Sequence, residues 1–310
     1  MRTRTINTLD VSVVGLGCNN FGGRIDYDAS AAVVHAALDA GITFFDTADI
    51  YGGTRSEEFL GRALGPRRAD IVLATKFGMQ VDAEHKGAKP AYVHSALEAS
   101  LRRLQTDHVD LYQLHAPDPD TPIADTLAAL DECVRAGKVI EIGCSNFTVA
   151  QLQEAEAAVS GTAAHFVSVQ NEYSLLRRKA ELDVLPECER AGLNFLPYFP
   201  LASGVLTGKY RRGQAPPTGA RLSGVKANEG PLSDDSLAAV ERLTEFAQRH
   251  DRSTVELAIA WIAAHRPVAS VIAGATSAEQ VHANVAAADW ELSADDLAEI
   301  DKLVPPPAGG

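Results

Sequence analysis

The sequence predicts one domain folded as a closed (β/α)8 barrel of parallel strands, and three observations lead to this prediction. Short, almost continuously apolar runs alternate with helical patterns, and eight such pairs follow one another along 310 residues. Strands that are apolar on both faces are typical of parallel sheets covered by helices. No composition break or low-complexity linker divides the chain. Eight consecutive units therefore favour a barrel over an open sheet.

The elements follow in order from these patterns. Strands are expected at 11–17, 42–46, 70–76, 109–115, 139–146, 165–173, 193–201 and 268–274. Helices are expected at 28–41, 56–64, 90–105, 122–137, 148–159, 180–192, 233–249, 253–265 and 277–288, with a C-terminal helix at 293–304. The first helix opens at an aspartate and closes at a glycine, which are common cap residues. Together these elements make residues 1–310 a single domain, with one long basic loop at 202–232.

The overall charge limits the classes of partner. Lysine and arginine number 28 against 41 aspartates and glutamates, a net charge of −13, so the surface as a whole does not suit nucleic acid or an anionic membrane. The four cysteines show neither CxxC nor zinc-ligand spacing, which indicates buried free thiols and no metal. Without a signal peptide or an apolar run of about 20 residues, we expect a cytoplasmic protein.

Reactive or polar side chains stand at the ends of the expected strands. In this type of barrel the reaction site lies at the carboxyl ends of the strands. Reading those ends in order gives Asp46, Lys76, His115, Ser145, Asn146, Gln170, Tyr198 and the segment after Gly274. Because these ends surround the same opening, their concentration predicts a functional site there.

The residue types at this opening are suited to proton transfer. A phenol with a pKa near 10 is a weak acid at neutral pH, but an adjacent ammonium such as that of Lys76 lowers the pKa, so Tyr51 is expected to be unusually acidic. Asp46 would keep Lys76 charged, and His115 could hydrogen-bond the same substrate oxygen. With these neighbours, the Tyr51 phenol would protonate a developing alkoxide during carbonyl reduction. The hydride must then come from a cofactor.

Eight motifs run in order across nearly the whole chain: GLGCNNFGG, FFDTADIYGG, ATKFG, LHAPDPDTP, GKVIEIGCSNF, QNEYSLL, PYFPLASGVLTGKY and IAGATSAEQVHANVAA. Together they resemble the aldo-keto reductases. This resemblance implies a TIM barrel that binds a nicotinamide dinucleotide across its mouth without a Rossmann domain. It also implies an oxidoreductase acting on a small carbonyl or alcohol substrate.

The resemblance assigns roles residue by residue. It makes Asp46, Tyr51, Lys76 and His115 a catalytic tetrad with Tyr51 as general acid–base. Ser145, Asn146 and Gln170 match residues that hold the carboxamide, and Tyr198 matches the ring that stacks on the nicotinamide. The remaining cofactor residues that it implies are Pro200, Leu201, Ser203, Gly204, Lys209, Arg221, Gly274, Thr276, Gln280 and Asn284.

The choice between NADP and NAD depends on two segments. Residues 204–227 contain five basic residues and no acid: Lys209, Arg211, Arg212, Arg221 and Lys226. Phosphates of a dinucleotide give a reason for this charge, and the glycines and prolines of the loop suggest a movable flap. From 268 to 290 the chain has no lysine or arginine, although many relatives read the 2′-phosphate there. NADP is expected, with NAD possible.

Several simpler interpretations compete with this one. Alone, Asp46 would be a turn cap, Lys76 a surface lysine, and Tyr51, His115 or Tyr198 core side chains. GLGCNNFGG does not fit the Rossmann pattern GxGxxG. The main alternative function is a nicotinamide-sensing binding protein with little turnover, like a potassium-channel β-subunit. A third possibility is an unrelated barrel, such as a sugar isomerase or lyase.

Overall fold

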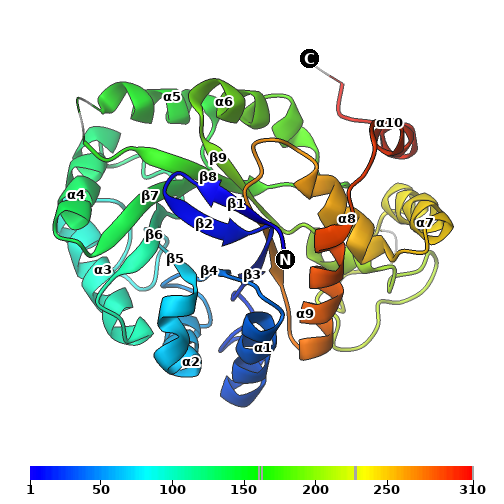
Figure 1. The fold of residues 1–310 in the computed structure, drawn as a ribbon, viewed down its shortest axis with the longest axis horizontal. Helices are drawn as coiled ribbons and strands as arrows, with labels where there is room; N and C mark the ends of the chain where they lie inside the picture. The colour runs from blue at the N-terminus through cyan, green and yellow to red at the C-terminus, as the bar shows by residue number, and fades with distance from the viewer. Residues whose placement is uncertain (160, 162, 227–228, 309–310) are drawn as a thin grey trace.

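Eight parallel strands form the centre of the protein in the computed structural model, which describes residues 1–159, 161, 163–226 and 229–308 (Figure 1). The strands are β3 (Val14–Gly17), β4 (Phe44–Asp46), β5 (Val72–Phe77), β6 (Val109–Leu114), β7 (Val139–Ser145), β8 (Phe166–Glu172), β9 (Asn194–Tyr198) and β10 (Val271–Gly274). Each pairs in parallel with its neighbour, in the order β10-β3-β4-β5-β6-β7-β8-β9. A parallel bridge between Phe195 and Val268 joins the two edges. The predicted (β/α)8 TIM barrel is confirmed.

Helices alternate with the strands and surround them (Figure 1). They are α1 (Tyr27–Asp39), α2 (Arg55–Leu64), α3 (Pro90–Leu104), α4 (Ile123–Arg135), α5 (Val149–Ala158), α6 (Val184–Ala191), α7 (Asp234–Arg249), α8 (Thr254–Ala263), α9 (Ala278–Val285) and α10 (Ala294–Leu303). In α1, α5, α7, α8, α9 and α10 the side chain of a serine, threonine or aspartate cap accepts the backbone N–H of the third residue after it. Over the described ranges, no helix is both long and apolar enough to cross a membrane.

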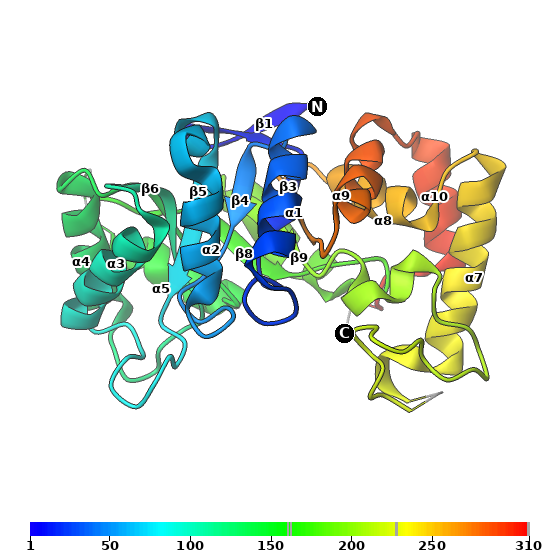
Figure 2. The ribbon, with the colours of Figure 1, turned by 90° about the horizontal axis from the view of Figure 1, so that it is seen from below.

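The expected first strand at 11–17 is wrong in one respect. The chain begins with an antiparallel hairpin of β1 (Thr3–Ile6) and β2 (Leu9–Ser12), and only then enters the barrel at β3. The hairpin lies across one end of the barrel (Figures 1 and 2). Its side chains Ile6, Leu9 and Val11 pack against apolar residues inside the barrel. Because β2 and β3 are both buried and adjacent in the chain, their apolar residues form one continuous run in the sequence, which predicts a single strand.

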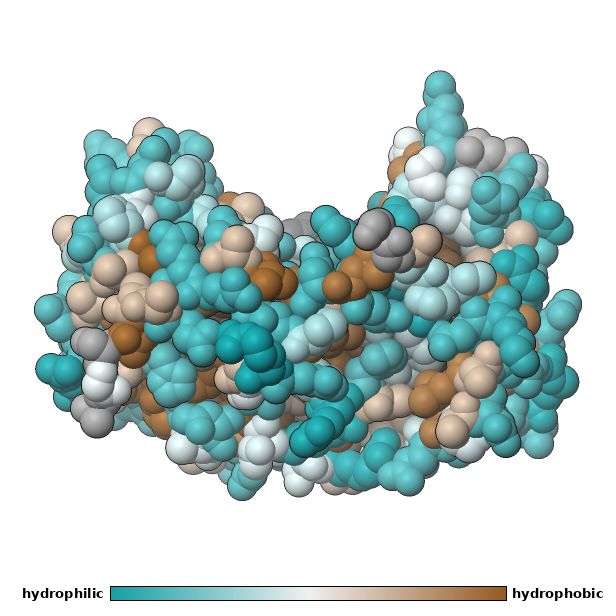
Figure 3. Space-filling model, turned by 90° about the horizontal axis from the view of Figure 1, so that it is seen from above, coloured by the Kyte–Doolittle hydropathy of each residue, from teal (hydrophilic) through white to brown (hydrophobic). Residues whose placement is uncertain are grey.

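The opposite end of the barrel carries the loops that follow the strands. The longest runs from β9 to α7 and contains the short helix Ala202–Thr207 and the expected basic loop. Within the expected range 202–232, residues 227 and 228 lie outside the described part of the chain. In Figure 3 hydrophobic side chains are scattered among hydrophilic ones, and the upper outline is hollowed between two raised sides.

Candidate active site

A cavity of about 710 Å³ opens where the barrel strands end. Among the residues that line it are Asp46 from β4, Ser145 from β7, Gln170 from β8, Tyr198 from β9 and Gly274 from β10. Tyr51 and His115 line it from the loops after β4 and β6. The ends of four strands, and the loops after two, therefore supply polar side chains to one cavity, as expected where the parallel strands of a barrel end together.

Lys76 is the centre of a buried polar cluster beneath this cavity. Its side chain is fully buried, and Nζ donates to Asp46 Oδ2 at 2.6 Å, to the Thr47 carbonyl at 2.8 Å and to the Tyr51 hydroxyl at 3.3 Å. These three acceptors use all three donors of the ammonium. Asp46 ends β4 and Lys76 lies on the adjacent β5, so the neighbouring strands bring the pair together.

The charges of this cluster differ in one respect from the expectation. Burial alone would lower the pKa of Lys76, but Asp46 and Tyr51 raise it above its usual value, so the ammonium stays charged as expected. The expected acidic phenol is not found: burial raises the pKa of Tyr51, and the opposing effect of Lys76 does not overcome it. The phenol therefore keeps its proton at neutral pH.

His115 stands beside the phenol as a neutral imidazole. Its ring meets that of Tyr51 edge to face, with 5.7 Å between the ring centroids. Burial, and then the positive charge of Lys76, lower the pKa of His115 to about 3. Within the described chain, Nδ1 of His115 is buried without a hydrogen-bond partner.

A second network of hydrogen bonds extends from His115 along the cavity wall. Asn146 donates from Nδ2 to the His115 carbonyl at 2.9 Å and to Ser145 Oγ at 3.1 Å, and its Oδ1 accepts from the Tyr198 hydroxyl at 2.8 Å. Ser145 Oγ donates to the Gln170 carbonyl at 2.7 Å. Asn146 holds a left-handed backbone with φ of 62°, a strained conformation of the kind that clusters at functional sites.

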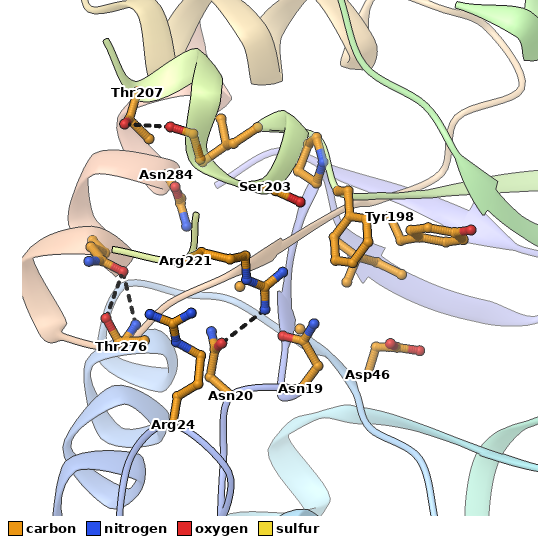
Figure 4. A pocket seen from close by; sticks show the side chains of 18 of the residues that line it. Asn19, Asn20, Arg24, Asp46, Tyr198, Ser203, Thr207, Arg221, Thr276 and Asn284 are labelled. Carbon is orange, nitrogen blue, oxygen red and sulfur yellow. Dashed lines mark hydrogen bonds between the residues drawn. The ribbon is translucent and has the colours of Figure 1, made fainter. Parts of the chain in front are cut away.

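Every residue that the resemblance assigns to the cofactor lines this cavity, together with Asp46, Tyr51 and His115, whereas Lys76 lies behind them. Figure 4 shows Thr276, Asn284 and Arg24 toward one side and Tyr198 and Asp46 toward the other, with the guanidinium group of Arg221 between them, donating to Asn20. The structure thus brings the predicted residues together. Their roles stay predictions.

Three cations, Arg24, Lys209 and Arg221, line the cavity close to one another. Burial, and then the charge of Arg24, lower the pKa of both Lys209 and Arg221. Arg221 Nη2 donates to Asn20 Oδ1 at 3.2 Å, and Arg24 Nη2 donates to the Gly219 carbonyl at 3.1 Å. Among the described residues, no carboxylate forms an ion pair with any of the three. Such a concentration of positive charge favours an anion.

Not all of the basic loop faces the cavity. Arg212 pairs with Glu241 at 3.0 Å, and Lys226 lies 3.9 Å from Glu229. These two side chains do not line the cavity. Lys209 and Arg221 are therefore the loop cations that can meet a ligand there.

Among the residues that sequence reasoning missed at the site, Arg24 and Gln113 carry polar groups that bear on its chemistry. Arg24 reaches the cavity from the loop after β3, where only its position behind a glycine pair could have suggested it. Gln113 is fully buried on β6 and donates to Asp46 Oδ1 at 3.2 Å. The signal for Gln113 was an amide within the otherwise apolar end of VDLYQLH.

Comparisons with known proteins agree with this geometry. The model of the family described as "Aldo/keto reductase family" matches residues 13–305. A probable voltage-gated potassium channel subunit beta from Oryza sativa subsp. japonica is 37% identical over 278 residues, covering 87% of this chain and 84% of that protein. Aldo-keto reductase YhdN of Bacillus subtilis is 32% identical over 305 residues, covering 96% and 91%.

A solved structure extends the similarity to three dimensions. The glycerol dehydrogenase AKR11B4 from Gluconobacter oxydans superposes with a TM-score of 0.87 at 30% identity, covering 99% of this chain and 97% of that one. Fold, ordered motifs and sequence identity over most of both chains point the same way. The chain belongs to the aldo/keto reductase family of oxidoreductases.

Proposed function

We propose that the protein reduces an aldehyde or ketone to an alcohol with NADPH, and that Tyr51 donates the proton. One observation carries this proposal: the Tyr51 hydroxyl lies 3.3 Å from the buried ammonium of Lys76, at the wall of a cavity large enough for a ligand. Ligand sites commonly enclose about 300–1,000 Å³.

The chain's own groups account for the proton transfer. With its pKa above the usual value, Tyr51 holds its proton until a stronger base forms on the substrate oxygen. Lys76 then stabilises the phenolate through a hydrogen bond that is already in place. Neutral His115 can hydrogen-bond the same oxygen without adding a second positive charge.

The remaining cavity residues suit a nicotinamide dinucleotide. Ser145, Asn146 and Gln170 offer amide and hydroxyl groups beside the tetrad, and Tyr198 offers an aromatic ring. Arg24, Lys209 and Arg221 would hold the phosphate groups. When bound, the reduced nicotinamide supplies the hydride.

A panel of aldehydes and ketones, with oxidation of NADPH as the readout, tests the proposal. We expect Tyr51→Phe to lower kcat/KM by at least about 10²-fold, with little change in the Kd of NADPH. Tyr27→Phe is the matched control, because Tyr27 packs on Phe59 away from the cavity. Full activity in Tyr51→Phe would show that another group donates the proton.

The similarity to two proteins named as potassium channel β-subunits supports a second candidate, a nicotinamide-binding protein with little turnover. The same panel separates the two functions. Tight binding of NADPH without oxidation of the cofactor by any carbonyl compound would favour the binding protein.

A further inference from the structure

Gln113 belongs to the buried cluster but does not line the cavity. It lies on β6 directly opposite Lys76 of β5. On its other side it is paired with Gly143 of β7. A Cβ at position 143 would stand 3.3 Å from Cγ of Gln113 and 2.6 Å from Ser168 Oγ. The glycine thus leaves the space in which the Gln113 side chain turns toward Asp46.

Asp46 determines which end of each neighbouring amide faces it. A carboxylate accepts hydrogen bonds and donates none. Its Oδ2 accepts from Lys76 at 2.6 Å, and its Oδ1 accepts from the Nε2 atoms of Gln113 at 3.2 Å and Gln170 at 2.9 Å. Both glutamines must therefore present nitrogen, and not oxygen, to Asp46.

Gln113 then fixes the rest of the Gln170 amide. With its nitrogen on Asp46, Gln113 has its Oε1 available, and this oxygen accepts from Gln170 Nε2 at 3.4 Å. The two protons of the Gln170 amide are now both used inside the cluster. Because Gln170 lines the cavity, its Oε1 is the amide atom left for a ligand, and an oxygen selects a hydrogen-bond donor.

We propose that Gln113 is a positioning residue that holds the Gln170 amide with its oxygen available to the cavity, so that the site selects a pyridine ring carrying a primary carboxamide. The proposal rests on the proposed function, since it concerns the same dinucleotide site. It extends that function by linking the carboxamide contact to the buried Asp46–Lys76 pair through one amide on β6.

The test compares NADP⁺ with its 3-acetylpyridine analogue, which keeps the carbonyl but replaces the NH2 donor by a methyl group. Isothermal titration calorimetry gives the Kd of each without turnover. We expect the wild-type protein to prefer NADP⁺ by about three- to tenfold, the range of one net hydrogen bond. In Gln113→Met, of similar size but without amide, Asp46 still accepts from Gln170 Nε2, but the second proton of that amide loses its acceptor. This preference should therefore fall without vanishing.

Two further variants separate this role from general destabilisation. Thr75→Val, on the neighbouring strand β5, removes a buried hydrogen bond to Glu57 of α2 and should keep the preference. Gln170→Met should lose the preference by itself, and Gln113→Met should then remove nothing more. Undiminished preference in Gln113→Met, or an additional loss in the double variant, would overturn the proposal.

A variant that retains the size and shape of the side chain covers the case in which Gln113→Met does not fold. In Gln113→Glu, the carboxyl beside Asp46 holds its proton at low pH and can then act as the amide does. The preference for NADP⁺ should be present at low pH and decline as pH rises. A preference that stays constant with pH would contradict the proposal. A wild-type protein that binds neither dinucleotide would instead refute the proposed function, and this inference with it.

Discussion

Asp46 and Lys76 show how a buried ion pair is retained at a functional position. Their side chains are almost completely buried, and desolvation of two charges offsets much of their attraction. Additional hydrogen bonds complete the shell: the Thr47 carbonyl accepts from the ammonium, and Gln113 and Gln170 donate to the carboxylate. The pair is therefore better explained by the charge it provides beside Tyr51 than by stability alone.

Removing only one partner should be costly. Lys76→Met leaves the Asp46 carboxylate buried without its cation, and we expect the free energy of unfolding to fall by about 3–5 kcal/mol. The double variant Asp46→Asn/Lys76→Met removes both charges and should recover much of this loss without recovering carbonyl reduction. Urea unfolding monitored by circular dichroism measures both. Equal stability of the single and double variants would contradict this account.

His115 should make the folded state sensitive to acid. Its pKa is about 3 in the folded protein and near 6.5 in an unfolded chain, so between these values the unfolded state binds the extra proton. Stability is then lost as pH falls from about 6.5 toward 3, at up to about 1.4 kcal/mol per pH unit. His115→Gln should flatten this part of the curve. Parallel unfolding curves for the two proteins over this range would argue against a buried neutral imidazole.

Arg24 should contribute to the choice between cofactors, because the segment 268–290 offers no lysine or arginine. Arg24→Gln should raise KM for NADPH about tenfold, the size of one charge-assisted contact, and change KM for NADH less. Arg212→Gln removes the same charge from an exposed pair with Glu241 and serves as the control. Equal changes for both cofactors would place Arg24 on the phosphates that they share. An NADH preference in the wild type would oppose NADP as the cofactor.

At the scale of elements, the strand–helix alternation could be predicted because each barrel strand is apolar on both faces. The hairpin of β1 and β2 could not, because its apolar side chains continue directly into those of β3. The proximity of Asp46, Tyr51, Lys76 and His115 could be predicted because each stands at the end of a strand or in the loop after it. Arg24 and Gln113 were missed because their contacts come from other strands and loops. No local pattern records such contacts.

The loop between β9 and α7 should respond to the cofactor. Lys209 and Arg221 face the cavity from this loop, whereas Arg212 turns to Glu241. If the loop closes over bound phosphates, saturating NADPH should slow tryptic cleavage after Arg221, as measured by mass spectrometry. Cleavage after Lys179, on the loop after β8, should not change. An unaltered rate at Arg221 would remove the reason to regard the loop as a flap.

At the scale of the whole molecule, the distribution of charge matters more than its sum. The chain carries a net charge of −13, yet three cations meet in one cavity. A concave, partly buried setting strengthens their field locally. An acidic protein can therefore attract a polyphosphate to one place while its remaining surface repels anions.

The hairpin at the amino end of the barrel also bears on the kinetics. Ile6, Leu9 and Val11 fill that end, so two ligands that meet at Tyr51 must share the mouth on the other side. Whichever molecule sits deeper has to arrive first and depart last. A compulsory sequence of binding would then follow from three aliphatic side chains on the far side of the barrel, which neither ligand touches.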